Sequence, residues 1–322
     1  MTETTALTTT KIGRLAHPLP LDQRPAAVYL AGLGSEASRR TMRQALDAIA
    51  HLLSGGQADA LAFPWWELRF QHVSAVRAAL SERYGMATTN KMLSALRGVL
   101  KAAWKLGQMD AEGYRLAASV RNVKGEALPA GRAITSGELS ALLDTCGQDA
   151  GGVRDAAMIA VLYSCGLRRA ELVALDIEDY DAQAGTLRIR GKGGKERLAH
   201  AVSGAAAALA DWLTLRGAGP GPLFHPVRKG GAILDGRLTT QAVYHVLRKR
   251  AAQAGVKELS PHDFRRTFVS DLLDAGADIA TVQKMAGHAQ VTTTARYDRR
   301  PEEAKRAAAN LLHVPYRRRV LG

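Results

Sequence analysis

The sequence from Ser260 to Tyr297 reads SPHDFRRTFVSDLLDAGADIATVQKMAGHAQVTTTARY. Its beginning predicts the start of a helix, because serine is a good N-cap and Pro261 suits the first helical position. A second helical segment follows and stops at Gly287, a residue type that often ends helices. The stretch is therefore expected to form two short helices, with its last residues beyond a turn.

Histidine, arginine and tyrosine side chains gather along these two helices. His262 and Arg265 are three residues apart and so share one helix face. His288 directly follows Gly287, and Tyr297 lies nine positions further on. Arginine offers paired N–H donors to a phosphate, histidine carries a proton near neutral pH, and tyrosine supplies an oxygen nucleophile. This combination predicts a site that holds a phosphate group while a phenol attacks it.

An arginine further upstream is also a candidate for this site. Residues 156–165 are almost all apolar and predict a buried helix, which Gly166 interrupts just before Arg168. An arginine next to a buried helix is costly without an anionic partner. Glu171, three residues on, could orient this side chain toward a bound anion, and a purely structural Arg–Glu pair is the alternative.

One pair of alternating segments predicts a β-hairpin. Residues 186–190 and 196–201 alternate, and the glycine-rich turn between them contains Lys192 and Lys195. Glycines on both sides of Lys192 would let its side chain reach into a cleft, whereas Lys195 is the competing candidate for the same role. Because helical spacing dominates elsewhere, the predicted fold class is mainly α with a small β-hairpin (α+β).

The N-terminal part of the sequence predicts a bundle of four or five helices. One helix is expected over residues 35–53, another begins at Pro64, and a further one is capped by Thr88 or Thr89. Basic residues lie away from the apolar stripes of two of these helices: Arg39, Arg40 and Arg43 on one, and Lys91, Arg97, Lys101 and Lys105 on the other. They indicate surfaces that grip a DNA backbone, with an ordinary solvated surface as the alternative.

The overall charge favours a nucleic-acid partner. The chain carries a formal charge of +14 and has a pI near 10.1, and such a positive field attracts polyanions. The excess of Lys and Arg is spread over both halves, so both are expected to touch nucleic acid. Two cysteines are too few for a disulfide framework, and no window resembles a membrane span, so a soluble cytoplasmic protein is expected.

Composition divides the chain into a predicted leader, two domains and a linker. Residues 1–20 are Thr-rich without an apolar signal core, which predicts a flexible leader. Residues 120–132 contain glycine and proline with little periodicity, which is typical of a linker. A helical DNA-binding domain would then span residues 21–119, and a second domain residues 133–322.

The motifs resemble, in kind and in order, those of the tyrosine recombinase and integrase family, close to Xer-type recombinases and phage or transposon integrases. They are Gly166-Leu167-Arg168-x-x-Glu171-Leu172, Gly191-Lys192-Gly193, His262-x-x-Arg265, Gly287-His288 and Tyr297. The resemblance covers most of residues 133–300. It implies a C-terminal catalytic domain preceded by an N-terminal helical, SAM-like core-binding domain.

The resemblance also implies how the phosphate is attacked. Tyr297 would attack the scissile phosphate and form a 3′-phosphotyrosyl link, while Arg168 and Arg265 would clamp the non-bridging oxygens. The implied partner is double-stranded DNA carrying a specific recombination site. Four protomers would form a tetrameric synapse on two such sites, with accessory DNA-bending or partner proteins as a further possibility.

The remaining matched residues are implied to move protons or to hold the phosphate. Lys192 would protonate the leaving 5′-oxygen, His262 would manage the proton of the tyrosine, and His288 would hydrogen-bond the phosphate. The phosphotyrosyl link conserves bond energy, so the implied reaction needs no metal, ATP or other cofactor.

Several choices stay open from the residues alone. Arg266 directly follows Arg265 and competes with it for the phosphate, or contacts DNA beside it. A type IB topoisomerase would use the same chemistry, and an architectural or regulatory DNA-binding protein could keep the fold without turnover. A metal-dependent nuclease built on His262, Asp263 and His288 is a further alternative. Residues 301–312 read as an amphipathic helix, which the resemblance implies could dock on a neighbouring protomer.

Overall fold

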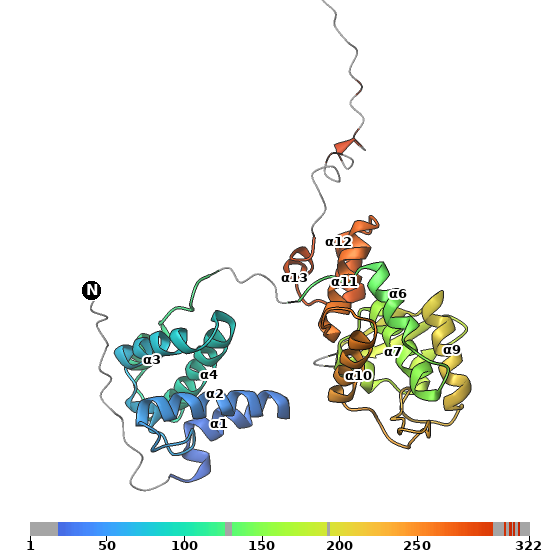
Figure 1. Ribbon diagram of the computed structural model, residues 1–322. Helices are drawn as coiled ribbons and strands as arrows, with labels where there is room; N and C mark the ends of the chain where they lie inside the picture. Colours follow the sequence, from blue (N-terminus) through green and yellow to red (C-terminus); the bar gives the residue numbers. More distant parts are fainter. Residues whose placement is uncertain are drawn as a thin grey trace, which may run out of the picture. The chain divides into compact units, whose positions relative to one another are not determined.

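The computed structural model describes residues 19–125, 131–191 and 194–298, together with residues 306, 309, 310, 312 and 315. Contacts divide the chain into two compact units, Met1–Pro129 and Ala130–Gly322 (Figure 1). These are called the first and second units below. Lys192 lies outside the described residues, as do most of the predicted leader and most of the segment 301–312.

In the described residues of the first unit, all the regular secondary structure is helical. Its helices are α1 (Pro25–Ala31), α2 (Glu36–Ser54), α3 (Phe70–Arg83), α4 (Met86–Lys105) and α5 (Ala111–Ala118), with short 3-10 turns at Leu21–Gln23 and Trp65–Glu67. Helix α4 contacts the other four helices and is the centre of the bundle. Leu46, Trp65 and Leu96 are each fully buried, so the apolar stripes of the sequence form the core.

Two helix starts differ from the sequence prediction. The segment from Pro64 first makes a 3-10 turn, and α3 begins only at Phe70. Helix α4 begins at Met86, before the predicted caps. Thr89 is buried and its hydroxyl donates to the Leu80 carbonyl at 3.2 Å, so it joins the end of α3 to α4 instead of capping a helix.

The second unit combines helices with one small antiparallel sheet, which confirms the predicted fold class. Its helices are α6 (Ser136–Asp144), α7 (Ala150–Cys165), α8 (Arg169–Ala174), α9 (Gly204–Arg216), α10 (Thr240–Gln253), α11 (Pro261–Asp274), α12 (Ile279–Ala286) and α13 (Val291–Ala295), and its strands are β1 (Tyr180–Asp181), β2 (Thr186–Arg190) and β3 (Glu196–His200). Strand β1 adds a third strand to the predicted hairpin. None of the helices in the described ranges combines the length and the hydropathy that a membrane span requires.

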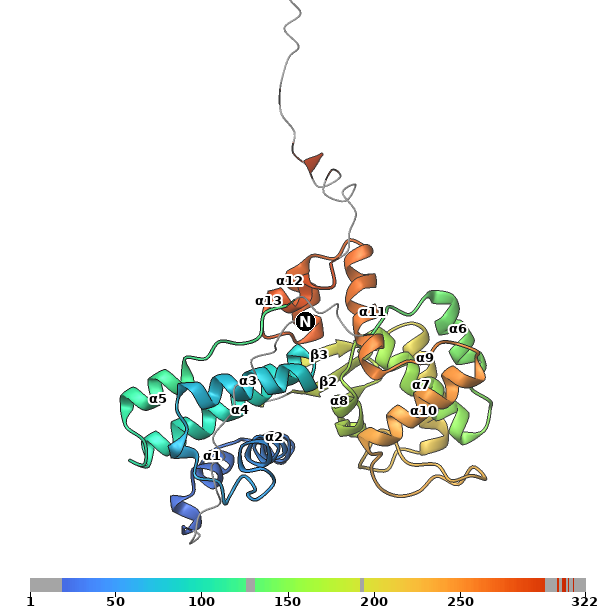
Figure 2. The same ribbon diagram turned by 60° about the vertical axis from the view of Figure 1, so that its left-hand side comes forward.

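The register of the hairpin decides which side chains face the core. Leu187 pairs with Ala199 and Ile189 pairs with Arg197, and both β2 residues of these pairs are fully buried. Arg197 therefore lies on the inward face of β3, while its apolar neighbour Leu198 is 58% exposed. Strand β3 contacts α7 and α12, and β2 contacts α8 (Figure 2).

Helix α11, which lies against the end of α7, contains the candidate site residues His262 and Arg265. It contacts α7, α10 and α12 (Figures 1 and 2). Gly166 ends α7 with a φ of 57°, and a Cβ there would lie 2.3 Å from the ring of Phe268 on α11. Only glycine allows this approach, which brings the residues after α7 next to the first turns of α11.

Candidate active site

Arg265 is the buried anchor of the site. Its side chain donates from Nη1 to the Gly166 carbonyl at 2.7 Å and from Nη2 to the Ala286 carbonyl. These carbonyls lie at the ends of α7 and α12, where helix carbonyls lack partners of their own. Burial, and then the nearby charge of Arg168, lowers the Arg265 pKa to about 10, so the residue remains a cation at neutral pH.

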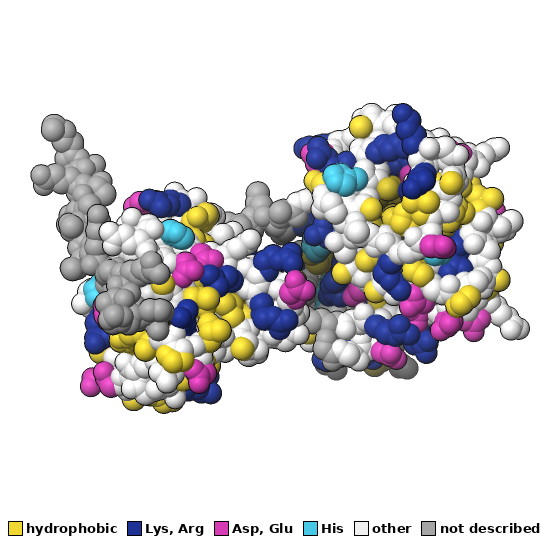
Figure 3. Space-filling model, turned by 90° about the horizontal axis from the view of Figure 1, so that it is seen from below, with side chains coloured by type: hydrophobic (Ala, Val, Ile, Leu, Met, Phe, Trp, Pro, Cys, Tyr) yellow, Lys and Arg dark blue, Asp and Glu magenta, His cyan; other side chains and the backbone are white. Residues whose placement is uncertain are grey.

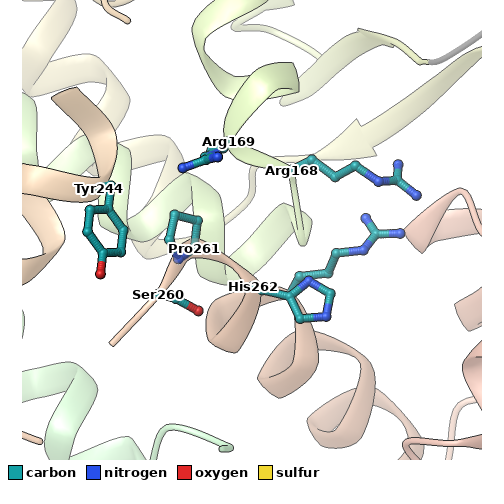
Figure 4. A pocket seen from close by; sticks show the side chains of 7 residues that line it. Arg168, Arg169, Tyr244, Ser260, Pro261 and His262 are labelled. Carbon is teal, nitrogen blue, oxygen red and sulfur yellow. The ribbon is translucent and has the colours of Figure 1, made fainter. Parts of the chain in front are cut away.

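Arg168 precedes α8 and is oriented by Glu171. Its Nη1 donates to Glu171 Oε1 at 2.6 Å, and its backbone N–H donates to Glu171 Oε2 at 2.9 Å. The arginine side chain stays 47% exposed while the glutamate is only 6% exposed. Arg168 and Arg169 point in opposite directions, and Arg168 extends to the side where His262 lies (Figure 4). The buried carboxylate thus holds a guanidinium that is still open to solvent.

Arg197 completes this network and was not predicted from the sequence. It donates from Nη1 and Nη2 to the two Glu171 oxygens at 3.1 and 2.8 Å, and from Nε to the Met285 carbonyl at 3.0 Å. Strand β3 is thereby tied to α8 and to the end of α12. The sequence alternation does not mark Arg197, because its inward direction depends on the pairing of β3 with β2, which places it opposite Ile189.

The two arginines keep Glu171 ionised. Burial alone would raise the pKa of this carboxyl, but the hydrogen bonds from Arg197 and Arg168 outweigh that effect and lower the pKa to about 2. The ionised carboxylate of Glu171 is therefore held between the guanidinium groups of Arg168 and Arg197.

Because the Glu171 carboxylate is ionised in the folded chain, protonating it in acid is expected to lower the free energy of unfolding. Because its folded pKa of about 2 lies below the ordinary 4.5, the stabilisation is fully present above about pH 4.5 and is lost as the pH falls toward 2. The shift corresponds to about 3 kcal/mol. Urea unfolding between pH 3 and 7 should show a steeper acid decline for the unchanged chain than for Glu171→Gln. Parallel declines in the two proteins would contradict the assignment.

Tyr297 and His262 meet across the site. The Tyr297 hydroxyl lies 3.2 Å from His262 Nε2, although the two residues belong to segments 35 positions apart. His262 is exposed. Desolvation of its ring, and then the charge of Arg265, lowers its pKa below the ordinary value, so the imidazole is neutral at neutral pH. A neutral Nε2 can accept the phenol proton.

His288 lies beside the tyrosine ring. Gly287 ends α12 with a φ of 65°, which turns the chain so that His288 Nδ1 lies 2.9 Å from Thr294 Oγ1. The rings of His288 and Tyr297 stack with centroids 6.2 Å apart. Burial, and then the charges of Arg265 and Arg168, lowers the His288 pKa to about 4. This residue too is neutral, and an anion in the site would raise its pKa.

A cavity of about 320 Å³ opens beside these residues (Figure 4). Its lining consists of Arg168, Arg169, Tyr244, Ser260, Pro261, His262 and Arg265. Ser260 caps α11 as predicted, with Pro261 at the first helical position. Lys195 is exposed at the hairpin turn. Across the described ranges, no group of three or more His, Cys, Asp or Glu side chains is arranged to hold a metal ion.

Arg266 differs from its predicted place on a DNA-contacting surface. Only 3% of the residue is exposed, and its Nη1 donates to the Gly131 carbonyl at 2.7 Å. Its guanidinium carbon lies 5.5 Å from the centroid of the Tyr297 ring. One residue further along α11 than Arg265, it turns away from the ends of α7 and α12 because the helix advances by about 100° per residue.

The basic residues of the first unit fall into two groups. Arg43 is 33% exposed and pairs with Asp47 and Asp59, and Arg97 donates to Asn122 at 2.6 Å, so both are tied into the fold. The others are exposed: Arg39, Arg40, Lys91, Lys101 and Lys105. On the face shown in Figure 3, Lys and Arg side chains of both units are interspersed with Asp and Glu.

The chain is similar in sequence and in fold to several known proteins. A profile of the Phage integrase family matches residues 132–303. The chain is 34% identical over 306 residues to the tyrosine recombinase XerD of Mycobacterium leprae, covering 91% of this chain and 93% of that one. It is 34% identical over 298 residues to XerC of Chromohalobacter salexigens, covering 90% and 95%. The solved Tn1549 transposon integrase, in complex with transposon right-end DNA, has a similar fold, with a TM-score of 0.64 at 17% identity over 91% of this chain and 99% of that one.

Proposed function

This chain belongs to the phage integrase family and is a tyrosine recombinase, and from this premise we propose that it cleaves and rejoins DNA through a 3′-phosphotyrosyl intermediate. The observation that carries the proposal is the 3.2 Å approach of the Tyr297 hydroxyl to His262 Nε2 beside the cavity lined by Arg168 and Arg265. A proton acceptor, a nucleophile and two phosphate-binding cations thus lie together.

The reaction begins with the transfer of the phenol proton to His262. The tyrosine oxygen then attacks the scissile phosphorus, the bond from phosphorus to the 5′-oxygen breaks, and the DNA 3′ end is joined to Tyr297. Because burial and the charge of Arg265 lower the pKa of His262, its Nε2 is free to accept the proton. Rejoining is the reverse step, in which a 5′-hydroxyl attacks the phosphotyrosyl link. One link replaces another of the same type, so the proposed reaction draws on neither ATP nor a metal ion.

The two arginines balance the charge of the transition state. A guanidinium carries five N–H donors. Arg265 donates one hydrogen bond from Nη1 and one from Nη2 to helix-end carbonyls, which leaves the other N–H groups for the phosphate. Arg168 is half exposed beside the same cavity, and Glu171 fixes its direction. Donors held in place before the reaction stabilise developing charge without having to reorganise. His288 adds a neutral imidazole that can hydrogen-bond a non-bridging oxygen.

Lys192, named from the sequence, is proposed to protonate the departing 5′-oxygen. Lys192→Ala is expected to slow cleavage about 10²- to 10⁴-fold on ordinary DNA, the usual contribution of a general acid. A substrate with sulfur at the bridging 5′ position should restore the rate to within about tenfold, because a thiol is acidic enough to leave unprotonated. Single-turnover cleavage of both substrates measures this effect.

Lys195→Ala is the matched control for the acid assignment. It is expected to leave both rates close to those of the unchanged chain, since Lys195 is the exposed alternative in the same turn. The role of acid would instead belong to Lys195 if Lys195→Ala cleaved ordinary DNA slowly and the 5′-sulfur substrate at a normal rate, while Lys192→Ala cleaved both substrates normally.

We further propose that the first unit grips the DNA backbone. Five exposed basic residues of α2 and α4 support this: Arg39, Arg40, Lys91, Lys101 and Lys105. The Tn1549 integrase, which has the same fold, was solved with DNA. The proposed domains are the core-binding residues 21–119 and the catalytic residues 133–322, joined by a linker. Four protomers are proposed to assemble on two DNA sites for strand exchange.

Capture of the covalent intermediate tests the proposed function. The full chain is incubated, with chelator present, with a library of duplexes that each carry a nick, so that a cleaved strand fragment diffuses away and rejoining fails. Protein-linked DNA that survives denaturant is recovered and sequenced. The expected result is an adduct at one preferred sequence. Relaxation of any supercoiled plasmid without preference would support the topoisomerase alternative, and specific binding without an adduct would support the architectural one.

A further inference from the structure

Arg266 is a buried cation that has no carboxylate partner among the described residues. Within the part of the chain that the structure describes, it forms no ion pair, and its Nε has no hydrogen-bond partner. Two other buried arginines of this unit differ: Arg154 and Arg250 both pair with Asp155, at 2.6 and 2.7 Å. Arg265, which is also buried, donates to two helix-end carbonyls instead. An uncompensated buried charge is strongly destabilising. A fold that keeps one must offset this cost through other contacts.

Two contacts hold the Arg266 guanidinium. Its Nη1 donates to the Gly131 carbonyl at 2.7 Å, and its Cζ lies 5.5 Å from the centroid of the Tyr297 ring. The face of an aromatic ring attracts a cation, and the attraction grows when water is excluded. The same ring carries the hydroxyl that reaches His262 and stacks on His288.

The segment that supplies the carbonyl is itself fixed along α11. Arg132 N–H donates to Asp263 Oδ1 at 2.9 Å, and Ile134 N–H donates to the Thr267 hydroxyl at 2.8 Å. Gly131 has a φ of 89°, and a Cβ there would lie 2.1 Å from Asp263 Oδ1. The backbone from Gly131 to Ile134 is therefore pinned on one side of α11, while His262 and Arg265 project from the other side toward the cavity.

We propose that Arg266 is a positioning residue for the nucleophile: anchored by the Gly131 carbonyl, its guanidinium supports one face of the Tyr297 ring and keeps the hydroxyl within reach of His262. The inference rests on the proposed role of Tyr297. It makes the backbone at the start of the second unit part of the apparatus that places the reacting oxygen. Small displacements of a nucleophile cost large factors in rate, so a support of this kind affects catalysis without touching DNA.

A stability cycle tests the contact without using activity. Thermal unfolding is measured for Arg266→Met in the unchanged chain, in Tyr297→Phe and in Tyr297→Leu. The phenylalanine keeps an aromatic face, so the loss of melting temperature caused by Arg266→Met should be similar in the first two backgrounds. In Tyr297→Leu the aromatic face that stabilises the buried Arg266 cation is absent. In that background Arg266→Met should therefore lower the melting temperature much less, or raise it.

A second pair provides the matched control for this cycle. Arg248 lies 5.8 Å from the centroid of the Tyr244 ring, but the arginine is 54% exposed and also pairs with Glu258. Arg248→Met is compared in Tyr244→Phe and Tyr244→Leu. Because water and the carboxylate compensate this exposed cation, the coupling to the ring should be small. Equal coupling in the two pairs would show that Arg266 is not specially supported by its tyrosine.

Kinetics then test the positioning role. At saturating DNA, single-turnover adduct formation should fall about tenfold or more in Arg266→Met, as expected for loss of a desolvated cation–ring contact. DNA affinity should change by less than about twofold, since the buried residue contributes no surface charge. Arg266→Lys, which keeps the cation, should recover part of the rate. Gly131→Ala, which displaces the anchor without changing any proposed catalytic side chain, should reproduce the slow rate.

The outcomes separate this inference from the proposed function. Absence of an adduct with the unchanged chain would count against the role of Tyr297 itself. With a normal adduct in the unchanged chain, an unaltered rate in both Arg266→Met and Gly131→Ala would overturn the positioning role. Equal melting losses for Arg266→Met in the Phe and Leu backgrounds would overturn the contact on which that role depends.

Discussion

Tyr297→Phe is expected to abolish formation of the covalent DNA adduct, with a fall in cleavage rate of about 10⁴-fold or more, the size seen when a nucleophile is removed. The phenyl ring keeps the stacking on His288 and the contact with Arg266, so the variant should fold and bind DNA like the unchanged chain. Only the oxygen that lies 3.2 Å from His262 is lost.

The measurement is denaturant-resistant DNA–protein linkage, with DNA affinity determined separately. Tyr244→Phe is the matched control, because Tyr244 also lines the cavity but its hydroxyl lies 3.1 Å from Glu258. That variant should still form the adduct. An adduct that persists in Tyr297→Phe and disappears in Tyr244→Phe would place the nucleophile on α10 and would refute the proposed mechanism.

The sequence was sufficient wherever a local pattern decides the structure. Ser260 and Pro261 specify the start of α11, because a helix cap depends on residues only a few positions apart. The hairpin was equally accessible, since its two strands are adjacent in the chain. The residues near the cavity were named because their order along the chain resembles a known family, and periodicity alone would not have joined Arg168 to Tyr297.

Residues that depend on distant partners were missed or misplaced. Arg197 is linked to Glu171, 26 positions earlier, through a strand register that the alternation of the hairpin does not reveal. Leu198, the apolar residue of that strand, faces solvent instead. Arg266 reads as a surface cation beside Arg265, but its environment is set by the Gly131 carbonyl, 135 positions away. Long-range contacts of this kind leave no local periodic signal.

The arginines are not interchangeable, and Arg168→Lys is expected to slow cleavage about 10²- to 10³-fold, the effect of removing one preorganised donor from a transition state. Lysine keeps the charge but lacks the planar fork that can pair with Glu171 and a phosphate oxygen together. Stability should change little, because Arg197 still donates to both oxygens of the buried carboxylate. The slow step should therefore appear in single-turnover rates at saturating DNA, and not in melting temperature.

Arg169→Lys provides the comparison that decides the register. Arg169 is the next residue and lines the same cavity, but it points toward Tyr244 and Pro261 and not along Arg168 (Figure 4). A change there is expected to alter DNA affinity more than the rate of the chemical step, since a cation that only contacts the backbone stabilises bound DNA and transition state equally. The opposite result, a large rate loss in Arg169→Lys with Arg168→Lys unaffected, would move the phosphate-binding role by one residue. In that case the pairing of Glu171 with Arg168 would stabilise the fold only, and the negative charge of Glu171 would have no role in the reaction.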